Sequence, residues 1–201
     1  MSIRPGRRLP APCAAVVLAA LLLLFVTPVC AAPAVELIVN GGFESAGTGW
    51  SQSSARGNNL ISGFFVYSGK AAADLAGNAL NNDTDRLTQK ITVPANVSAR
   101  LQFWWALRTE EAGVAFDTLA IKVLNNSGGL LKTLATYDNT TLAPYTWEQA
   151  SFDLSAYAGQ TIQIQFEAKT DQGNPTEFFI DDVSVRTAGP MKRSFLPLIR
   201  R

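Results

Sequence analysis

Alternation of apolar and polar residues recurs along the chain from residue 34 onward and predicts β-strands. Residues 161–167 read Thr-Ile-Gln-Ile-Gln-Phe-Glu, so one face of this segment packs against a core while the other meets water. Residues 118–123 repeat the pattern, and residues 100–107 place Leu101, Phe103, Trp105 and Leu107 on one side. The remaining predicted strands cover residues 36–39, 71–75, 87–93, 130–136, 150–154 and 177–185.

Clusters of turn-forming residues separate these segments. Asn125-Asn126-Ser127-Gly128-Gly129 predicts a hairpin turn, because glycine and asparagine tolerate positive φ. Residues 171–175 play the same role before the last strand, and no amphipathic helix of three turns is evident after residue 34. Many short antiparallel strands predict an all-β fold, a two-sheet antiparallel jelly-roll β-sandwich spanning residues 35–186.

The first 31 residues have the pattern of a secretory signal peptide. Three arginines precede an apolar run over residues 14–26, and Val29-Cys30-Ala31 offers small residues for cleavage. We therefore expect a secreted, extracellular or cell-surface protein with a short extension at residues 32–34. An uncleaved membrane anchor is an alternative, and so is lipidation of Cys30, although Thr27-Pro28-Val29 lacks the small residue expected before a lipidated cysteine.

Composition narrows the possible chemistry. The chain has no histidine, which removes the commonest transition-metal ligand and proton carrier, and both cysteines, Cys13 and Cys30, lie in the leader. A core or a metal, rather than disulfides, must then hold the domain together. The leader contains three of the seventeen basic residues and none of the sixteen acidic ones, so the rest of the chain has a net charge of −2. This charge gives no electrostatic reason to expect nucleic-acid binding.

The tail, residues 187–201, breaks the strand pattern. Basic residues flank an apolar cluster there, namely Phe195-Leu196-Pro197-Leu198-Ile199. A flexible end is one interpretation and a short sorting or docking signal is the other.

Several motifs follow one another in an order that suggests a family. Asn40-Gly41-Gly42-Phe43-Glu44 follows the first strand, and Trp50 comes soon after it. The others are residues 67–72, 89–94, 147–149 and 152–154, and the closing segment 178–185. Over residues 35–185 the chain resembles the galactose-binding-like jelly rolls, in particular the carbohydrate-binding modules of secreted xylanases and glucanases.

The resemblance implies one structural calcium ion where the first and last strands meet. Its implied ligands are the Asn40 carbonyl, the Glu44 carboxylate, a carbonyl near Lys70, and a carboxylate from Asp181 or Asp182. Such oxygen ligands suit calcium. Ile180 and Val183 are both apolar but three residues apart, which breaks the alternation and predicts a β-bulge at the two aspartates.

The resemblance also implies a polysaccharide or other glycan as ligand, held on a polar sheet face with exposed aromatic rings. Alternation places Trp104 and Gln102 on the polar face of their strand. Gln163 and Gln165, beside Glu167, form a second polar face, and the two faces make one platform if both strands belong to one sheet. The tyrosines expected at its rim are Tyr137 and Tyr145, with Tyr67 and Trp147 nearby.

Two other classes of function compete with this one. Glycoside hydrolysis needs only two carboxylates, and the candidate pairs are Glu110 with Glu111, Asp83 with Asp85, and Asp181 with Asp182. An extracellular adhesion or structural module, binding a cell-surface protein, is the stronger alternative to glycan binding. A non-catalytic monomer, with membrane contact only through an uncleaved leader, is the expectation.

Overall fold

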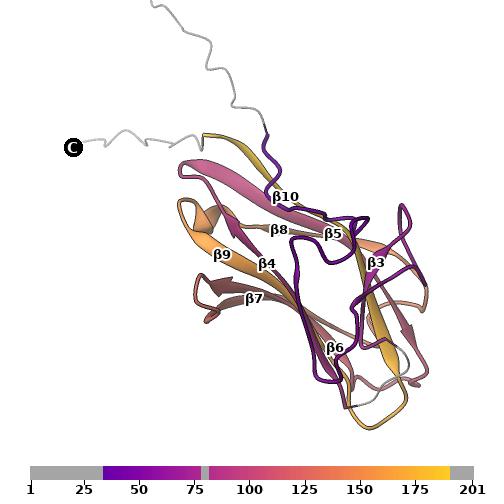
Figure 1. Ribbon diagram of the computed structural model, residues 1–201. Helices are drawn as coiled ribbons and strands as arrows, with labels where there is room; N and C mark the ends of the chain where they lie inside the picture. The colour runs from indigo at the N-terminus through magenta and orange to yellow at the C-terminus, as the bar shows by residue number, and fades with distance from the viewer. Residues whose placement is uncertain (1–33, 78–81, 191–201) are drawn as a thin grey trace, which may run out of the picture. The chain divides into compact units, whose positions relative to one another are not determined.

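The computed structural model describes residues 34–77 and 82–190, and its strands form two antiparallel sheets of five (Figure 1). One sheet has the order β1-β4-β9-β6-β7, with β1 at Ser51–Ser54, β4 at Thr84–Thr92, β9 at Thr161–Lys169, β6 at Thr118–Asn125 and β7 at Leu130–Asp138. The other has the order β2-β3-β10-β5-β8, with β2 at Ile61–Ser62, β3 at Ala72–Leu75, β10 at Thr176–Pro190, β5 at Val97–Thr109 and β8 at Glu148–Asp153.

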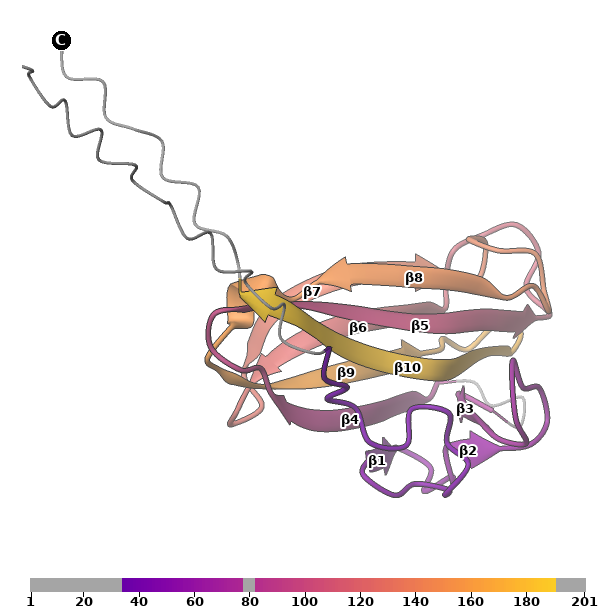
Figure 2. The same ribbon diagram turned by 90° about the horizontal axis from the view of Figure 1, so that it is seen from above.

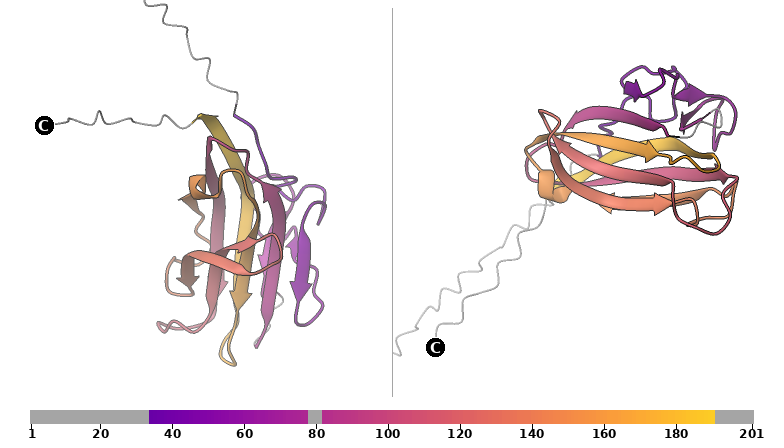
Figure 3. Two further views of the ribbon diagram at one scale, coloured as in Figure 1. Left: turned by 90° about the vertical axis from the view of Figure 1, so that its left-hand side faces the viewer. Right: turned by 90° about the horizontal axis from the view of Figure 1, so that it is seen from below.

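The two sheets face each other as layers of a sandwich, with β8, β5 and β10 side by side in one of them (Figure 2). Figure 3 shows the same two layers from other sides. The alternating segments supply the core between them: the second, fourth and sixth residues of β9 are fully buried, as are the four inward residues of β5. Phe103 of β5 meets Phe166 of β9 edge to face, with ring centroids 5.0 Å apart. Burying each such ring stabilises the fold by about 2 kcal/mol.

The predicted hairpin and the predicted bulge are both present. The 125–129 turn joins β6 to β7, with the Asn125 N–H bonded to the Gly129 carbonyl at 2.7 Å. The pairing of β10 with β5 shifts register between Asp181 and Ser184, and Asp182 has a φ of +48°. The bulge points the two aspartates toward different surroundings, since Asp181 is buried and Asp182 is exposed.

The first predicted strand, residues 36–39, makes only one strand-like bridge, between Glu36 and Arg186. At Val39, the buried side-chain amide of Gln89 makes the two backbone hydrogen bonds that a neighbouring strand would otherwise make. Its oxygen accepts the Val39 N–H at 2.7 Å, and its nitrogen donates to the Val39 carbonyl at 2.9 Å. The backbone then turns at Asn40, where φ is +55°.

Some sequence predictions fall outside the described residues. The leader, residues 1–31, is one, and most of the tail is another. Within the part that the structure describes, helices are too short and too polar to cross a membrane. The last strand continues to Pro190, past the predicted domain end at Arg186.

Candidate ligand-binding face

A hollow of about 500 Å³ lies against the outer face of the sheet that contains β5, β8 and β10. Its lining includes Glu36, Gln102, Trp104, Gln149, Asp182 and Arg186. The pairing of the strands explains why these side chains gather. Trp104 lies opposite Gln149 on β8, and Gln102 lies between Ser151 on β8 and Ser184 on β10. The structure therefore brings Gln102 and Trp104 together on one face, as the alternation predicted.

Trp104 does not stand alone on this face. The ring of Tyr67 stacks on it, with centroids 4.1 Å apart and planes 14° from parallel. Tyr67 also meets Trp147 edge to face at 5.6 Å, and Trp147 stacks on Phe65 at 5.2 Å. Tyr145 joins the cluster through Phe65. A partly exposed aromatic surface thus lies beside the side-chain amides of Gln102 and Gln149, and Tyr67 belongs to it as the stacking partner of Trp104.

Gln163 and Gln165 lie on the opposite sheet, because β9 belongs to the β1-β4-β9-β6-β7 layer. The expectation of one platform shared with Trp104 was therefore wrong. Sequence alternation gives the face of a strand but not the sheet to which the strand belongs. Gln163 donates to the carbonyls of Asn125 and Asn126, and Gln165 donates to the Thr88 hydroxyl.

The outer face of β9 is also occupied by an ion cluster. Glu167 binds Arg86 at 2.6 Å, Lys122 at 2.6 Å and Lys169 at 3.2 Å. Burial works to raise the pKa of Glu167, but hydrogen bonds from these three cations outweigh it and lower the pKa to about 2.

Tyr137, which was expected at the rim of the binding face, packs against the core instead. Its ring stacks on inward-facing Trp105 with centroids 4.1 Å apart.

The carboxylates expected to hold calcium contact the segment 67–71. Glu44 accepts the backbone N–H groups of Lys70 at 2.7 Å and Ala71 at 3.1 Å, both on Oε1. Asp182 accepts the Ser68 hydroxyl at 3.0 Å. The Asn40 carbonyl accepts the Trp50 indole N–H at 3.0 Å. The two carboxylates therefore contact one loop, whereas the Asn40 carbonyl is bonded to Trp50.

Asp181 and Asp182 differ as candidate ligands. Asp181 is fully buried and accepts the N–H groups of Tyr67 and Ser68 on Oδ2, each at 3.0 Å. Burial is the largest influence on its pKa and raises it, against the lowering effect of these backbone bonds. Asp182 is exposed. Among the described residues, no three acidic, histidine or cysteine side chains are close enough to hold a metal. The expected set, with two carboxylates and two carbonyls, needs no third.

The family model of the MAM domain, meprin/A5/mu, matches residues 42–189. The chain belongs to the MAM domain family. Bacillopeptidase F of Bacillus subtilis is 31% identical over 159 residues, covering 74% of this chain and 10% of that protein. Pre-pro-metalloprotease PrtV of Vibrio cholerae is 30% identical over 117 residues, covering 52% of this chain and 12% of that protein. The MAM domain chain thus spans about a tenth of the length of these relatives.

Solved structures of similar fold include TmCBM61 in complex with β-1,4-galactotriose, with a TM-score of 0.55 and 19% identity over 75% of this chain and 97% of that one. The K3 cleaved adhesin domain of Lys-gingipain from Porphyromonas gingivalis also has a TM-score of 0.55, with 17% identity over 77% and 99% of the two chains. At these identities the likeness concerns the fold. It confirms the predicted galactose-binding-like jelly roll for this MAM domain.

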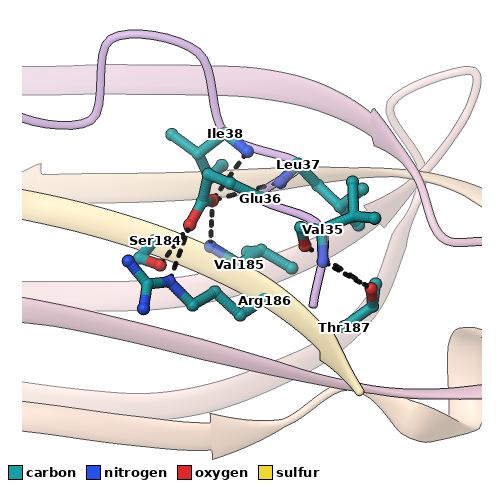
Figure 4. A network of polar contacts seen from close by, with 8 residues as sticks. All are labelled: Val35, Glu36, Leu37, Ile38, Ser184, Val185, Arg186 and Thr187. Carbon is teal, nitrogen blue, oxygen red and sulfur yellow. Dashed lines mark hydrogen bonds and ion pairs between the residues drawn. The ribbon is translucent and has the colours of Figure 1, made fainter. Parts of the chain in front are cut away.

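Sequence reasoning missed Glu36, Gln149 and Arg186, which line the same hollow. Figure 4 shows Glu36 as the centre of a polar network that ties the first segment to β10. Its carboxylate accepts the N–H groups of Ile38 and Val185 and the Ser184 hydroxyl, and Arg186 lies 3.4 Å away. Burial works to raise the pKa of Glu36, but these hydrogen bonds outweigh it and lower the pKa. Alternation along β10 could have placed Arg186 on the outer face of its sheet. The neighbours of Arg186 across the sheet could not be predicted from this pattern.

Proposed function

We propose that this MAM domain is an exported, non-catalytic carbohydrate-binding module, and that its glycan binds in the hollow beside Trp104. The observation that carries the proposal is the stacked Trp104–Tyr67 pair next to Gln102 and Gln149. Sugars present apolar C–H faces that pack on aromatic rings, and hydroxyl groups that hydrogen-bond with amides. The galactotriose complex of TmCBM61 supports the same ligand class for this fold.

Structural roles of the candidate acids favour binding over hydrolysis. Asp83 and Asp85 are buried, so neither can reach a polysaccharide from the surface. Glu110 pairs with Arg108, and Glu111 accepts the Asn174 N–H. A hydrolase needs two carboxylates placed on either side of one glycosidic bond. The first pair is buried instead, and the second pair is engaged by Arg108 and by the backbone of Asn174.

We also propose a structural calcium ion bound by Glu44 and Asp182 with the carbonyls of Asn40 and Lys70. Asp182 is exposed, which supports it as the ligand over buried Asp181. The N–H bonds to Glu44 use only Oε1, which supports Glu44 as a second ligand. Bound calcium would supply a cross-link between the first segment, the 67–71 loop and the bulge of β10.

Binding of a protein partner is the second candidate function. The ring of Phe64 is 61% exposed beside the aromatic cluster, and large exposed aromatic residues are typical of protein interfaces. The similarity to an adhesin domain favours the same class. In this case the aromatic rings, rather than the amides beside them, would make the main contacts.

A glycan array followed by calorimetry on any glycan that binds tests the first proposal. Trp104→Ala should weaken binding by about thirtyfold, or ~2 kcal/mol, because a central stacking ring is lost. Gln102→Ala should weaken it as well without disturbing the aromatic packing. Gln163→Ala, an amide removed from the opposite sheet, is the matched control and should bind like wild type. Wild-type binding by folded Trp104→Ala and Gln102→Ala variants would contradict the proposal.

A further inference from the structure

Four charged residues form a row across the ligand-binding sheet at one level. Glu36 bridges to Arg186, Arg186 pairs with Arg100, and Arg100 pairs with Asp153. The two arginines are thus direct cross-strand neighbours on β10 and β5. Their alternation with inward Leu101 and Val185 places both on the outer face. Like charges in this position repel each other when nothing lies between them.

The arginine pair lines a second hollow, of about 330 Å³, which meets the first. Both hollows are lined by Gln102 and Arg186, and the second adds Arg100, Ser98 and Ser155. Trp104 lies six positions after Ser98 on β5, a distance of about 20 Å along an extended strand. A ligand that packs on Trp104 can therefore extend along β5 and β10 over both guanidinium groups.

The flanking acids are engaged with their own neighbours. Asp153 accepts the N–H and the hydroxyl of Ser155 on Oδ1. Glu36 is held by the backbone and by Ser184, and its contact with Arg186 is 3.4 Å long. The Arg186 side chain is 71% exposed, and Arg100 donates from one terminal nitrogen to the Ser151 hydroxyl. Each guanidinium has five N–H donors and uses one of them in these contacts, so most of this capacity remains for a ligand.

We propose that the Arg100–Arg186 pair binds an anionic substituent, a carboxylate or a sulfate, on the glycan held by Trp104. Planar guanidinium groups bind such anions through paired, charge-assisted hydrogen bonds. An anion between the two side chains also removes their mutual repulsion. This inference rests on the proposed glycan site and narrows its ligand to an acidic polysaccharide.

Calorimetry with oligosaccharides of equal length tests it, using a neutral β-1,4-galactan, an oligogalacturonate and a sulfated galactan. Wild-type protein should bind one or both acidic probes at least tenfold more tightly than the neutral one, and high salt should abolish the difference. Comparison of the oligogalacturonate with the sulfated galactan identifies which anion, carboxylate or sulfate, the Arg100–Arg186 pair prefers. Arg100→Ala and Arg186→Ala should each weaken acidic binding by about tenfold. Arg100→Ala should leave neutral binding unchanged, whereas Arg186→Ala, which also alters the lining of the first hollow, should weaken neutral binding much less than acidic binding.

Two further variants make the test specific. Lys132→Ala removes the same charge from β7 on the opposite sheet and should change nothing. Asp153→Asn keeps the acceptor for Ser155 but removes a competing negative charge, and should strengthen acidic binding. Neutral probes that bind as tightly as acidic ones would overturn this inference and leave the glycan site standing. Failure of every probe, neutral and acidic, to bind would overturn both this inference and the proposed glycan site. Unchanged thermal melting midpoints would show that the arginine variants are folded.

Discussion

Asp74 on β3 and Glu167 on β9 are carboxylates whose surroundings shift their pKa values in opposite directions. Burial is the main influence on Asp74, and the nearby charges of Glu177 and Asp85 add to it, so that its pKa rises from 3.8 to about 6. The hydrogen bond from Ser62 lowers it only in part. Three cations have the reverse effect on Glu167. Each shift implies a distinct dependence of stability on pH.

Asp74→Asn should change how stability varies between about pH 4 and pH 6. In this window the folded protein holds a proton on Asp74 that the unfolded chain has released, so the wild-type free energy of unfolding falls as pH rises. The asparagine variant has no such proton. Urea unfolding at both ends of the window should show the variant gaining stability relative to wild type as pH increases. A constant difference would contradict the shift.

Glu167→Gln should destabilise the domain by about 2 kcal/mol at neutral pH, because three cations lose a buried partner. The figure is moderate because Arg86 and Lys169 are partly exposed to solvent. The folded pKa is depressed, so this stabilisation is present above about pH 4.5 and is lost as pH falls toward 2. Chemical unfolding at several pH values measures it. Glu148→Gln, at an exposed site, should have little effect.

At the scale of elements, strict alternation made β5 and β9 predictable, whereas β1 was not. Its sequence Ser-Gln-Ser-Ser contains no apolar residue, so only pairing with β4 identifies it as a strand. Trp104 could be placed on a polar face from the sequence of β5 alone. That Gln163 faces away from it depends on the sheet order, and so does the pairing of Arg100 with Arg186. Such long-range pairing leaves no local pattern in one sequence.

The close approach of the first segment to β10 depends on a glycine. A Cβ at Gly41 would overlap the backbone carbonyl oxygen of Val183, whereas one at Gly42 would lie 3.3 Å from the Asp182 side chain. Gly41→Ala should therefore destabilise the domain by about 3 kcal/mol, because backbone cannot move aside as a side chain can. Gly42→Ala is the neighbouring control and should cost much less. Equal denaturation midpoints for the two variants would refute this account.

At the scale of the whole molecule, the proposed calcium site joins the candidate ligand-binding face to the first segment. The loop that Glu44 and Asp182 hold also carries Tyr67, which stacks on Trp104. Chelation should lower the thermal midpoint, since a ligand of the folded state stabilises it. Scanning calorimetry with EDTA and with added calcium measures the change. Glu44→Gln should be insensitive to chelator, while Asp138→Asn should respond like wild type; an unchanged wild-type midpoint would rule out the ion.

The two ends of the described domain lie side by side. The Val35 N–H donates to the Thr187 hydroxyl at 3.2 Å, and the Thr187 N–H donates to the Val35 carbonyl at 3.0 Å. A unit that begins and finishes at one point can be inserted into a surface loop of a host protein without stretching that loop. Recombination could therefore move the whole β-sandwich into a different host protein with both of its sheets intact.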